Sequence, residues 1–454
     1  MNSRKPSIER ILQPFEEFVH LEASGGVLLL LFTVLALIWA NSPWSSAYTS
    51  LWQTQLVVGL GDFSLAKPLL LWINDGLMAI FFLVVGLEIK RELLVGGLAS
   101  LQQAALPIAA AAGGMVLPAI IYVAWNIGKP DVTGWGIPMA TDIAFALGIF
   151  ALLGKRGNPS LKLFLTALAI VDDIGAVLVI ALFHTANIAW IGLVVAALFM
   201  GLLILSNWIG IRHPLVYAVL GIGLWFAFLK SGIHATVAGV LLAMTIPART
   251  RIDTEKFLER SRTILHEFED TCRLGREPLA DQGRHAALQA LETACQHAET
   301  PLQRLEHVLH PWVAFGIMPL FALANAGVCL TAEVASCLTN PVALGIIAGL
   351  VLGKPIGVTL FTWLSVRSGI TTLPSGVTWR QIVGTGCLAG IGFTMSLFIA
   401  GLAFGGSPLL DVAKIGIMVG SPVVGMIGWI ALRFGSRNKE GETMEASMRL
   451  GRIR

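Results

Sequence analysis

Charged side chains are scarce in this chain. Asp, Glu, Lys and Arg make up 13% of its 454 residues, against about 25% in an ordinary soluble domain. Hydrophobic residues make up 55%, and the mean hydropathy is +0.76. This composition excludes an ordinary soluble protein and predicts an all-α polytopic membrane protein.

Long apolar runs take the place of charge. A helix needs about 20 apolar residues to cross a bilayer, since each residue adds about 1.5 Å along the axis. By that measure we expect about twelve spans. They lie near residues 25–41, 68–87, 104–125, 135–153, 161–183, 190–207, 214–229, 233–247, 312–330, 342–365, 381–404 and 412–432.

Features of a secreted, disulfide-rich protein are also scarce. No short apolar run near the N-terminus ends at a small-residue cleavage site, so we expect no removable signal peptide. There are only 5 Cys. Cys272 and Cys295 fall in an expected cytoplasmic loop and should stay reduced. Cys329 and Cys337 fall in an outward loop, where a disulfide and free thiols are both consistent with the sequence.

Basic residues are distributed unevenly between the two sides of the expected membrane. With an even number of spans both termini lie on one side, which carries most of the 31 Lys and Arg. The residues that fall on the opposite side are Lys67, Lys129, Lys230 and Lys414. Because cytoplasmic loops are rich in Lys and Arg, both termini are predicted to be cytoplasmic.

This topology divides the chain into consecutive parts. They are a cytoplasmic amphipathic arm (1–24), a first transmembrane block (25–247), a charged, His-containing cytoplasmic loop insertion (248–308), a second transmembrane block (309–432) and a basic cytoplasmic tail (433–454). Apolar residues at helical spacing predict a helical hairpin in the insertion, turning around Gly275–Gly283. A solvated loop is its default interpretation, and a regulatory element is the alternative because His titrates near neutral pH.

Two adjacent carboxylates interrupt the middle of one span. The stretch 161–183, LKLFLTALAIVDDIGAVLVIALF, carries Asp172 and Asp173. Each costs roughly 2.5–3.5 kcal/mol at that depth unless it is protonated, paired or facing a cavity. Neighbours on a helix point about 100° apart, so one carboxylate can take a fixed partner while the other faces an aqueous path. An ion or proton site is the favoured interpretation, and a structural contact between helices is the alternative.

Two other spans are predicted to be interrupted. In 135–153 a proline removes a helix donor just before Thr141 and Asp142. Irregular backbone at this depth survives only where it is buried in protein or lines a cavity. In 381–404 several glycines lead into Thr394, although glycines can also merely permit close helix packing.

The interrupted spans are the middle members of two groups of three, 104–183 and 342–432. This pattern is typical of transporters with inverted-topology repeats, in which two discontinuous helices cross at the midplane. Two positive and two negative half-helix ends would then meet. Asp142 is expected to neutralise the positive ends. Lys354, in the middle of a span, is available to the negative ends and to Asp172, unless it snorkels to the surface.

Other polar groups give weaker signals. Glu88, Arg91 and Glu92 crowd the cytoplasmic end of the second span, where interfacial anchoring and a charged funnel mouth are both consistent with the sequence. His234 and Asn325 have no carboxylate or histidine close by in the sequence, so neither suggests a metal site.

The chain also contains several longer strings that are specific. They are GLEIKREL (86–93), ATDIAFALG (140–148), LAIVDDIGA (168–176), LKSGIHATVAG (229–239), RLEHVLHPWVAFGIMPLFALANAGV (304–328), LGKPIG (352–357) and GIGFTMSLFIA (390–400). They resemble strings of the NhaA Na⁺/H⁺ antiporters over nearly the whole chain. The resemblance implies pH-regulated exchange of Na⁺ or Li⁺ for H⁺ across a bacterial inner membrane, with no cofactor and no nucleic-acid partner. Homodimers are common in such families.

The resemblance also implies residue roles. Asp172 and Asp173 match the paired carboxylates that bind Na⁺ and protons, with Asp173 the favoured ligand and Asp172 ion-paired to Lys354 in the empty or protonated site. Thr141 and Asp142 match the broken-helix crossing. Positions at a cytoplasmic funnel tied to pH activation are matched by Glu88, Arg91, Glu92, Glu306, His307 and His310. The stretch from about 250 to 303 is longer than the family's usual loop, which leaves the pH control of this chain open.

The expected mechanism is competition for one carboxylate site. Na⁺ prefers hard oxygen ligands, burial disfavours a charged carboxylate, and a nearby cation favours it. A proton and Na⁺ would therefore exclude each other, and two protons moving against one Na⁺ would make transport electrogenic.

Two other functions are weaker candidates. An intramembrane aspartyl protease needs one Asp on each of two facing helices, whereas this doublet is adjacent, so no enzyme is predicted. A Na⁺-coupled solute symporter of related architecture would need an organic-substrate pocket.

Overall fold

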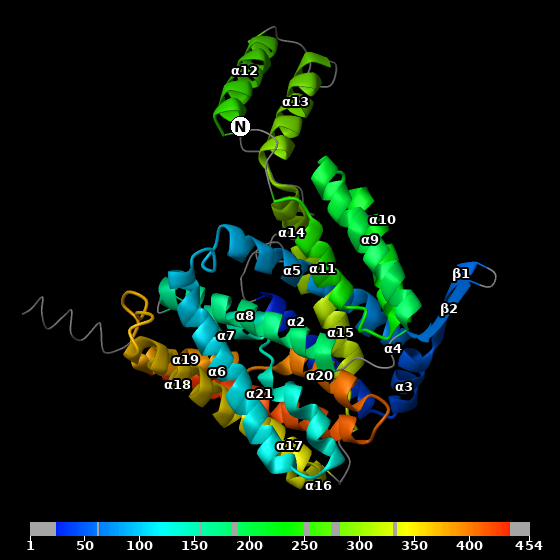
Figure 1. Ribbon diagram of the computed structural model, residues 1–454, viewed down its shortest axis with the longest axis vertical. Helices are drawn as coiled ribbons and strands as arrows, with labels where there is room; N and C mark the ends of the chain where they lie inside the picture. Colours follow the sequence, from blue (N-terminus) through cyan, green and yellow to red (C-terminus); the bar gives the residue numbers. More distant parts are fainter. Residues whose placement is uncertain are drawn as a thin grey trace, which may run out of the picture.

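The computed structural model of the chain is a bundle of helices (Figure 1). The structure describes residues 24–60, 63–154, 157–183, 189–248, 254–273, 282–329 and 334–435. The expected N-terminal arm and basic tail lie almost entirely outside these residues, as do the side chains of Cys272, His285 and His297. Within the described ranges, nine helices are long and apolar enough to cross a membrane, or up to eleven if two bent pairs each count as one span. The predicted all-helical polytopic class is confirmed.

The first part of the chain contains a bent helix pair, a β-hairpin and a span with a π-helical turn. The elements are α2 (Ser24–Ala40), α3 (Ser45–Gln53), β1 (Gln55–Leu60), β2 (Phe63–Pro68), α4 (Leu69–Trp72), η1 (Ile73–Leu77) and α5 (Met78–Leu94). The two strands pair antiparallel, with Gln55 opposite Pro68. The hairpin departs from the purely helical prediction because QLVVGL is too short for a span and rich in Val, which favours strands.

The next part carries the first interrupted span and one helix shorter than predicted. The elements are α6 (Leu101–Asn126), η2 (Pro130–Met139), α7 (Ile143–Ala151), α8 (Pro159–Phe183), α9 (Trp190–Ile209), α10 (Pro214–Ser231) and α11 (Val237–Thr245). In the span expected near 233–247, helix covers only Val237–Thr245, because Gly232 ends α10 at φ +85° and the chain turns before α11 begins. This short helix accounts for the difference from the expected number of spans.

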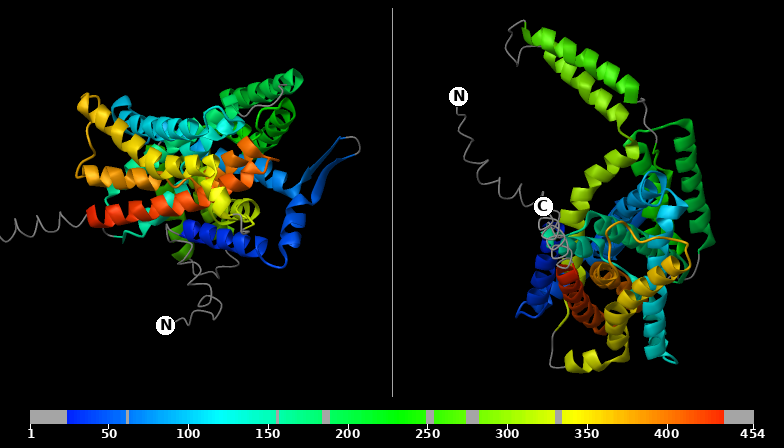
Figure 2. Two further views of the ribbon diagram at one scale, coloured as in Figure 1. Left: turned by 90° about the horizontal axis from the view of Figure 1, so that it is seen from below. Right: turned by 90° about the vertical axis from the view of Figure 1, so that its left-hand side faces the viewer.

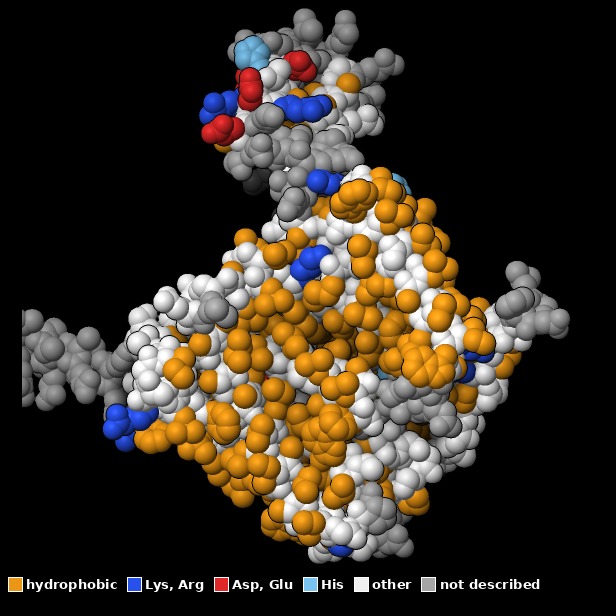
Figure 3. Space-filling model, in the orientation of Figure 1, with side chains coloured by type: hydrophobic (Ala, Val, Ile, Leu, Met, Phe, Trp, Pro, Cys, Tyr) orange, Lys and Arg blue, Asp and Glu red, His pale blue; other side chains and the backbone are white. Residues whose placement is uncertain are grey.

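The last part contains a helical hairpin and the second interrupted span. The elements are α12 (Thr254–Arg273), α13 (Gln282–Ala298), α14 (Pro301–Trp312), η4 (Val313–Ile317), α15 (Met318–Asn325), α16 (Val334–Thr339), α17 (Pro341–Ala348), η5 (Gly349–Gly353), α18 (Lys354–Arg367), α19 (Trp379–Ala389), α20 (Phe393–Phe404) and α21 (Leu409–Gly435). The α12–α13 hairpin stands away from the rest of the bundle (Figure 2). Charged side chains of both signs gather on it, whereas the visible face of the bundle is mostly hydrophobic (Figure 3).

Glycines bring α6 and α18 into close contact and so position Lys354. A Cβ atom added to Gly113 would overlap the carbonyl oxygen of Gly357, and one added to Gly357 would overlap that of Gly113. The next residue, Gly114, leaves space for the Lys354 stem, whose Cε lies 3.6 Å from where a Cβ would be. Lys354 itself follows the π-helical turn η5 and is fully buried.

This packing predicts that Gly357→Val destabilises the protein. The added side chain must displace the backbone of α6, and overpacking of this kind costs about 1–3 kcal/mol or more. The melting temperature of the purified protein in detergent is therefore expected to fall. Gly201→Ala is the matched control, since no atom lies within 4 Å of its added Cβ. Equal melting temperatures for the two variants would contradict the close contact.

Candidate ion-binding site

The two interrupted spans cross where their helices break. The backbone N–H of Asp142 donates to the Ile391 carbonyl at 2.6 Å, and the Ser396 hydroxyl donates to the Ile137 carbonyl at 2.7 Å. On one side of the crossing η2 ends at Met139 and α7 begins at Ile143. On the other side α19 and α20 meet at an angle of 45°. Residues about 250 positions apart thus complete each other's backbone hydrogen bonding.

Asp142 caps the N-termini of both half-helices. One carboxylate oxygen accepts from the backbone N–H of Phe145 in α7 at 3.1 Å. The other accepts from the backbone N–H of Thr394 in α20 at 3.0 Å and from the Thr394 hydroxyl. Asp142 is 1% exposed, so these bonds are shielded from bulk solvent. A negative charge here offsets the positive ends of two helix dipoles.

Lys354 lies at one of the negative ends. Its ammonium group donates to the Met139 carbonyl, where η2 ends, and lies 2.7 Å from Oδ2 of Asp172. Both side chains of the ion pair are 0% exposed. A buried Lys is stable only when it is paired, and here it is shared between a helix end and a carboxylate.

Thr141 connects Asp172 to the other negative end. Its hydroxyl oxygen lies 2.6 Å from Oδ2 of Asp172 and 2.8 Å from the carbonyl oxygen of Ala389, the last residue of α19. A hydroxyl has one proton to donate, so it serves one of these acceptors at a time. When it donates to Ala389, it can keep its contact with Asp172 only if Asp172 is protonated.

Asp173 is as buried as Asp172 but has no ion pair among the described residues, whereas Asp172 pairs with Lys354. Both residues are 1% exposed. Oδ1 of Asp173 and Oδ1 of Asp172 have no hydrogen-bond partner among the described residues. Buried polar atoms without partners are rare and call for an explanation. Unsatisfied carboxylate oxygens of this kind can be completed by a proton or by a small hard cation.

Six residues expected at a funnel mouth are brought together by α5 and α14. Arg91 forms ion pairs with Glu306 and, at 3.4 Å, with Glu92, whose carboxylate also accepts from the Gly97 N–H at 2.8 Å. These two helices border a cavity of about 580 Å³, lined by Glu88, Arg91, Glu299, Gln303, Glu306, His307 and His310. Glu299 and Gln303 were missed in the sequence analysis because their place in the cavity wall depends on how α14 and the residues before it pack against α5.

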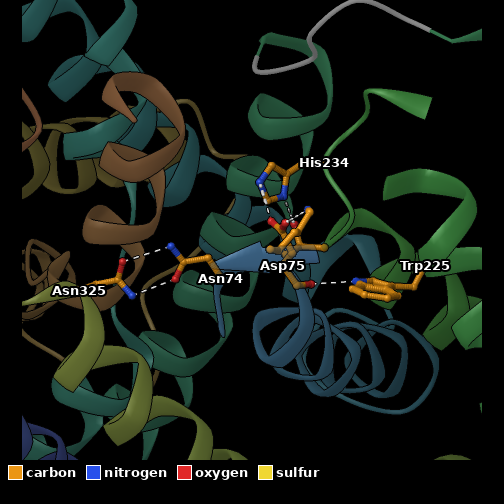
Figure 4. Close-up of polar contacts among 7 residues, drawn as sticks. Asn74, Asp75, Trp225, His234 and Asn325 are labelled. Atoms are coloured by element: carbon orange, nitrogen blue, oxygen red, sulfur yellow. Dashed lines mark hydrogen bonds and ion pairs between the residues drawn. The ribbon is translucent and has the colours of Figure 1, made fainter. Parts of the chain in front are cut away.

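A second polar cluster lies around η1 (Figure 4). Asn74 and Asn325 exchange side-chain hydrogen bonds of 3.2 and 2.9 Å. His234 lies 3.8 Å from Asp75, which also pairs with Lys67 at 2.7 Å. His234 therefore has a carboxylate neighbour in space that its surrounding sequence did not show, because Asp75 comes from another helix.

The described residues also show the state of the cysteines and whether side chains gather around a metal site. Cys295, Cys329, Cys337 and Cys387 are free thiols, so Cys329 and Cys337 are not bonded to each other. Among the residues that the structure describes, no group of three or more His, Cys, Asp or Glu side chains is arranged to hold a metal ion.

Comparisons with known proteins agree with this architecture. Residues 16–432 match the family described as Na⁺/H⁺ antiporter 1. The chain is 54% identical over 435 residues to a Na⁺/H⁺ antiporter NhaA of Oleidesulfovibrio alaskensis, covering 96% of this chain and 97% of the relative. It is 51% identical over 430 residues to NhaA of Koribacter versatilis, covering 95% and 93%. It is 50% identical over 428 residues to NhaA 2 of Syntrophotalea carbinolica, covering 94% and 98%.

Lys354→Ala should destabilise the protein at alkaline pH, where Asp172 would be left as a buried charge without its cation. Removing one partner of a buried ion pair costs about 3–5 kcal/mol, so the melting temperature in detergent should fall by roughly 5 °C or more. Lys230→Ala, which removes an exposed ammonium group at the end of α10, is the control. An unchanged melting temperature for Lys354→Ala would count against the pair.

Proposed function

The chain belongs to the Na⁺/H⁺ antiporter 1 family and is a secondary transporter, not an enzyme, and we propose that Asp172 and Asp173 form the one site at which Na⁺ and protons bind in turn. The observation that carries the proposal is the pair of unpartnered carboxylate oxygens, one on each residue. Na⁺ and protons both complete such oxygens, and neither can do so while the other is bound.

Asp173 is the favoured Na⁺ and proton ligand. It has no ion pair to break among the described residues, whereas Asp172 already pairs with Lys354. Na⁺ bound between the two carboxylates would compete with the Lys354 ammonium for Asp172. That competition releases a proton from the site, either from Asp173 itself or from Lys354. Two protons exchanged for one Na⁺ would make transport electrogenic.

Thr141 couples the protonation state of Asp172 to the crossing. With Asp172 charged, the hydroxyl donates to it and releases the Ala389 carbonyl at the end of α19. With Asp172 protonated, the same hydroxyl is free to bind that carbonyl. Ion exchange would thus change a hydrogen bond between two broken helices, which are the elements that move in alternating access.

The membrane orientation is part of the proposal. Most Lys and Arg residues lie on one side of the spans, which supports cytoplasmic termini in a bacterial inner membrane. The cavity between α5 and α14 is then the cytoplasmic funnel that attracts cations toward the site. Li⁺ shares the charge and ligand preference of Na⁺ and is proposed as an alternative substrate, and a homodimer is proposed as the assembly.

Regulation by pH is assigned to the funnel mouth. Its titratable or charged groups are Glu88, Arg91, Glu92, Glu299, Glu306, His307 and His310. Arg91 holds α5 to α14 through Glu306, and histidines change charge between about pH 5 and 8. Protonation at the mouth would therefore alter both the cation attraction and the contact between the two helices. Within the insertion, proposed as a regulatory element, α13 leads into α14 through Glu299 and Thr300.

Asp172→Asn and Asp173→Asn are expected to abolish Na⁺-driven proton movement. Asn cannot bind a proton reversibly or carry the negative charge that a cation requires. The measurement is dequenching of a pH-sensitive dye in everted vesicles after addition of Na⁺ or Li⁺. Asp411→Asn, at an exposed carboxylate in the first turn of α21, should retain activity. Retained flux in both site variants would refute the assignment.

Removal of residues 254–298 tests the regulatory element. This deletion keeps Thr300, whose hydroxyl caps the first turn of α14. Because α13 ends beside Glu299 at the funnel mouth, the midpoint of activity against pH should move by about 0.5 pH unit or more, an effect of about 0.7 kcal/mol. An activity profile identical to that of the intact protein would show that the insertion has no regulatory role.

A further inference from the structure

The α12–α13 hairpin has a core of its own that is very small. Ile264, Ala287 and Ala294 are buried between the two helices and form a cluster separate from the transmembrane core. The helices have 20 and 17 residues, and a unit below about 40 residues usually needs a further support such as oligomerisation. Two of the three buried side chains are alanines, which bury little area, and the side chains that pack against them, Phe257, Phe268, Ala290 and Leu291, are only partly buried.

Each helix carries more apolar surface than its partner helix covers. Leu258 and Leu265 on α12 are 48% and 49% exposed, and Leu288 on α13 is 52% exposed. Cys295, seven positions after Leu288, is also exposed. These residues repeat every seven positions, directly beside the buried row. The buried row and the exposed residues beside it together form a wide apolar stripe. Such a stripe is typical of a helix that packs against two neighbours in a bundle, whereas a contact between two helices needs only the buried row.

The exposed residues of the two helices lie on the same side of the hairpin. On each helix they follow the buried row by one residue, a rotation of about 100°. Because the helices run antiparallel, equal rotations on both turn toward the same side. Leu258, Leu265, Leu288 and Cys295 therefore form one continuous surface, the apolar flank. Polar residues occupy the opposite side, among them Arg260, Thr263, Glu267 and Thr293.

We propose that the apolar flank packs against the same flank of a second copy of this chain, so that two hairpins form an antiparallel four-helix bundle. This assigns a contact surface to the proposed homodimer and does not depend on the ion-binding residues. In a two-fold arrangement, α12 of one copy lies beside α13 of the other.

The flank is complementary to itself in that arrangement. Residues at equal distances from the turn between α12 and α13 lie at the same level. Leu265 of one copy then faces Leu288 of the other, and Leu258 faces Cys295. At the edge of the flank, Arg262 lies level with Glu292 of the other copy. Two apolar contacts and one opposite-charge pair therefore form in the same register, and each occurs twice.

The charge of the hairpin favours a second copy over a lipid surface. Helices that lie on membranes carry mostly Lys and Arg on their polar face. The sequence of α12 instead carries five acidic residues and four basic ones, in the order Glu255, Lys256, Glu259, Arg260, Arg262, Glu267, Glu269, Asp270 and Arg273. The hairpin also stands away from the rest of the bundle (Figure 2).

A disulfide between copies tests the arrangement in the full-length protein. The starting variant keeps Cys295 as its only native cysteine and carries Leu258→Cys as a second one. Within one hairpin these two side chains leave helices whose axes are about 8–10 Å apart, on parallel courses, which is too far for a disulfide with Cβ atoms about 3.8 Å apart. Between copies they face each other. Mild oxidation in membranes should therefore give mostly covalent dimer on a non-reducing gel.

Thr263→Cys in the same background is the matched control. Thr263 is exposed on the polar side of α12 and should give no covalent dimer. Absence of dimer in the Leu258→Cys protein, a disulfide within one chain, or equal cross-linking in the control would each overturn the proposal. Quenching of a fluorophore on residue 258 by brominated lipid would also overturn it, since the flank would then lie on the bilayer.

A second substitution separates packing from chance collision. Adding Leu288→Lys to the Leu258→Cys protein puts an unpaired charge opposite Leu265 of the other copy, and cross-linking should slow about tenfold. Thr293→Lys, on the polar side of α13, should leave the rate unchanged. Equal rates for these two variants would contradict the proposed interface.

Discussion

Four half-helix ends meet in the buried interior of this protein, and the rest of the site depends on how their charges are balanced. The N-termini of α7 and α20 share one carboxylate, Asp142. The end of η2 takes the ammonium group of Lys354, and the end of α19 takes the hydroxyl of Thr141. Each group is buried. Loss of Asp142 or Lys354 would leave an unpaired backbone dipole at membrane depth, which costs several kcal/mol.

This balance also makes the two neighbouring aspartates unequal. The Lys354 ammonium group already donates to the Met139 carbonyl at a helix end, and it also lies 2.7 Å from Oδ2 of Asp172. Asp173, one residue further along α8, points about 100° away and has an oxygen with no partner. A proton or a cation at Asp173 would therefore change the charge next to an ion pair that also holds the crossing together. Under the proposed function, ion binding and helix position would be linked through Asp173, Asp172 and Lys354 rather than through a long pathway.

The sequence predicted those features that follow from single residues. Pro138 and the glycines before Thr394 marked both broken helices, and two carboxylates in an apolar span marked the proposed site. The hydrogen-bond partners across the crossing were harder to predict from the sequence, because they depend on how far each helix is shifted along its neighbour. No pattern in the sequence specifies that Lys354 reaches the Met139 carbonyl. For the same reason Asn74 and Asn325, 251 positions apart, could not be paired in advance, and the β1–β2 hairpin was missed because its strands are short.

The central claim is that Na⁺ and protons compete for the same buried carboxylates. Proton release on addition of Na⁺ to the purified, weakly buffered protein, measured over a range of pH, tests it most directly. The account predicts that Na⁺ binding displaces protons, that apparent Na⁺ affinity rises as the pH rises, and that Asp173→Asn eliminates the release. Na⁺ binding with no proton release and with an affinity independent of pH would contradict the account.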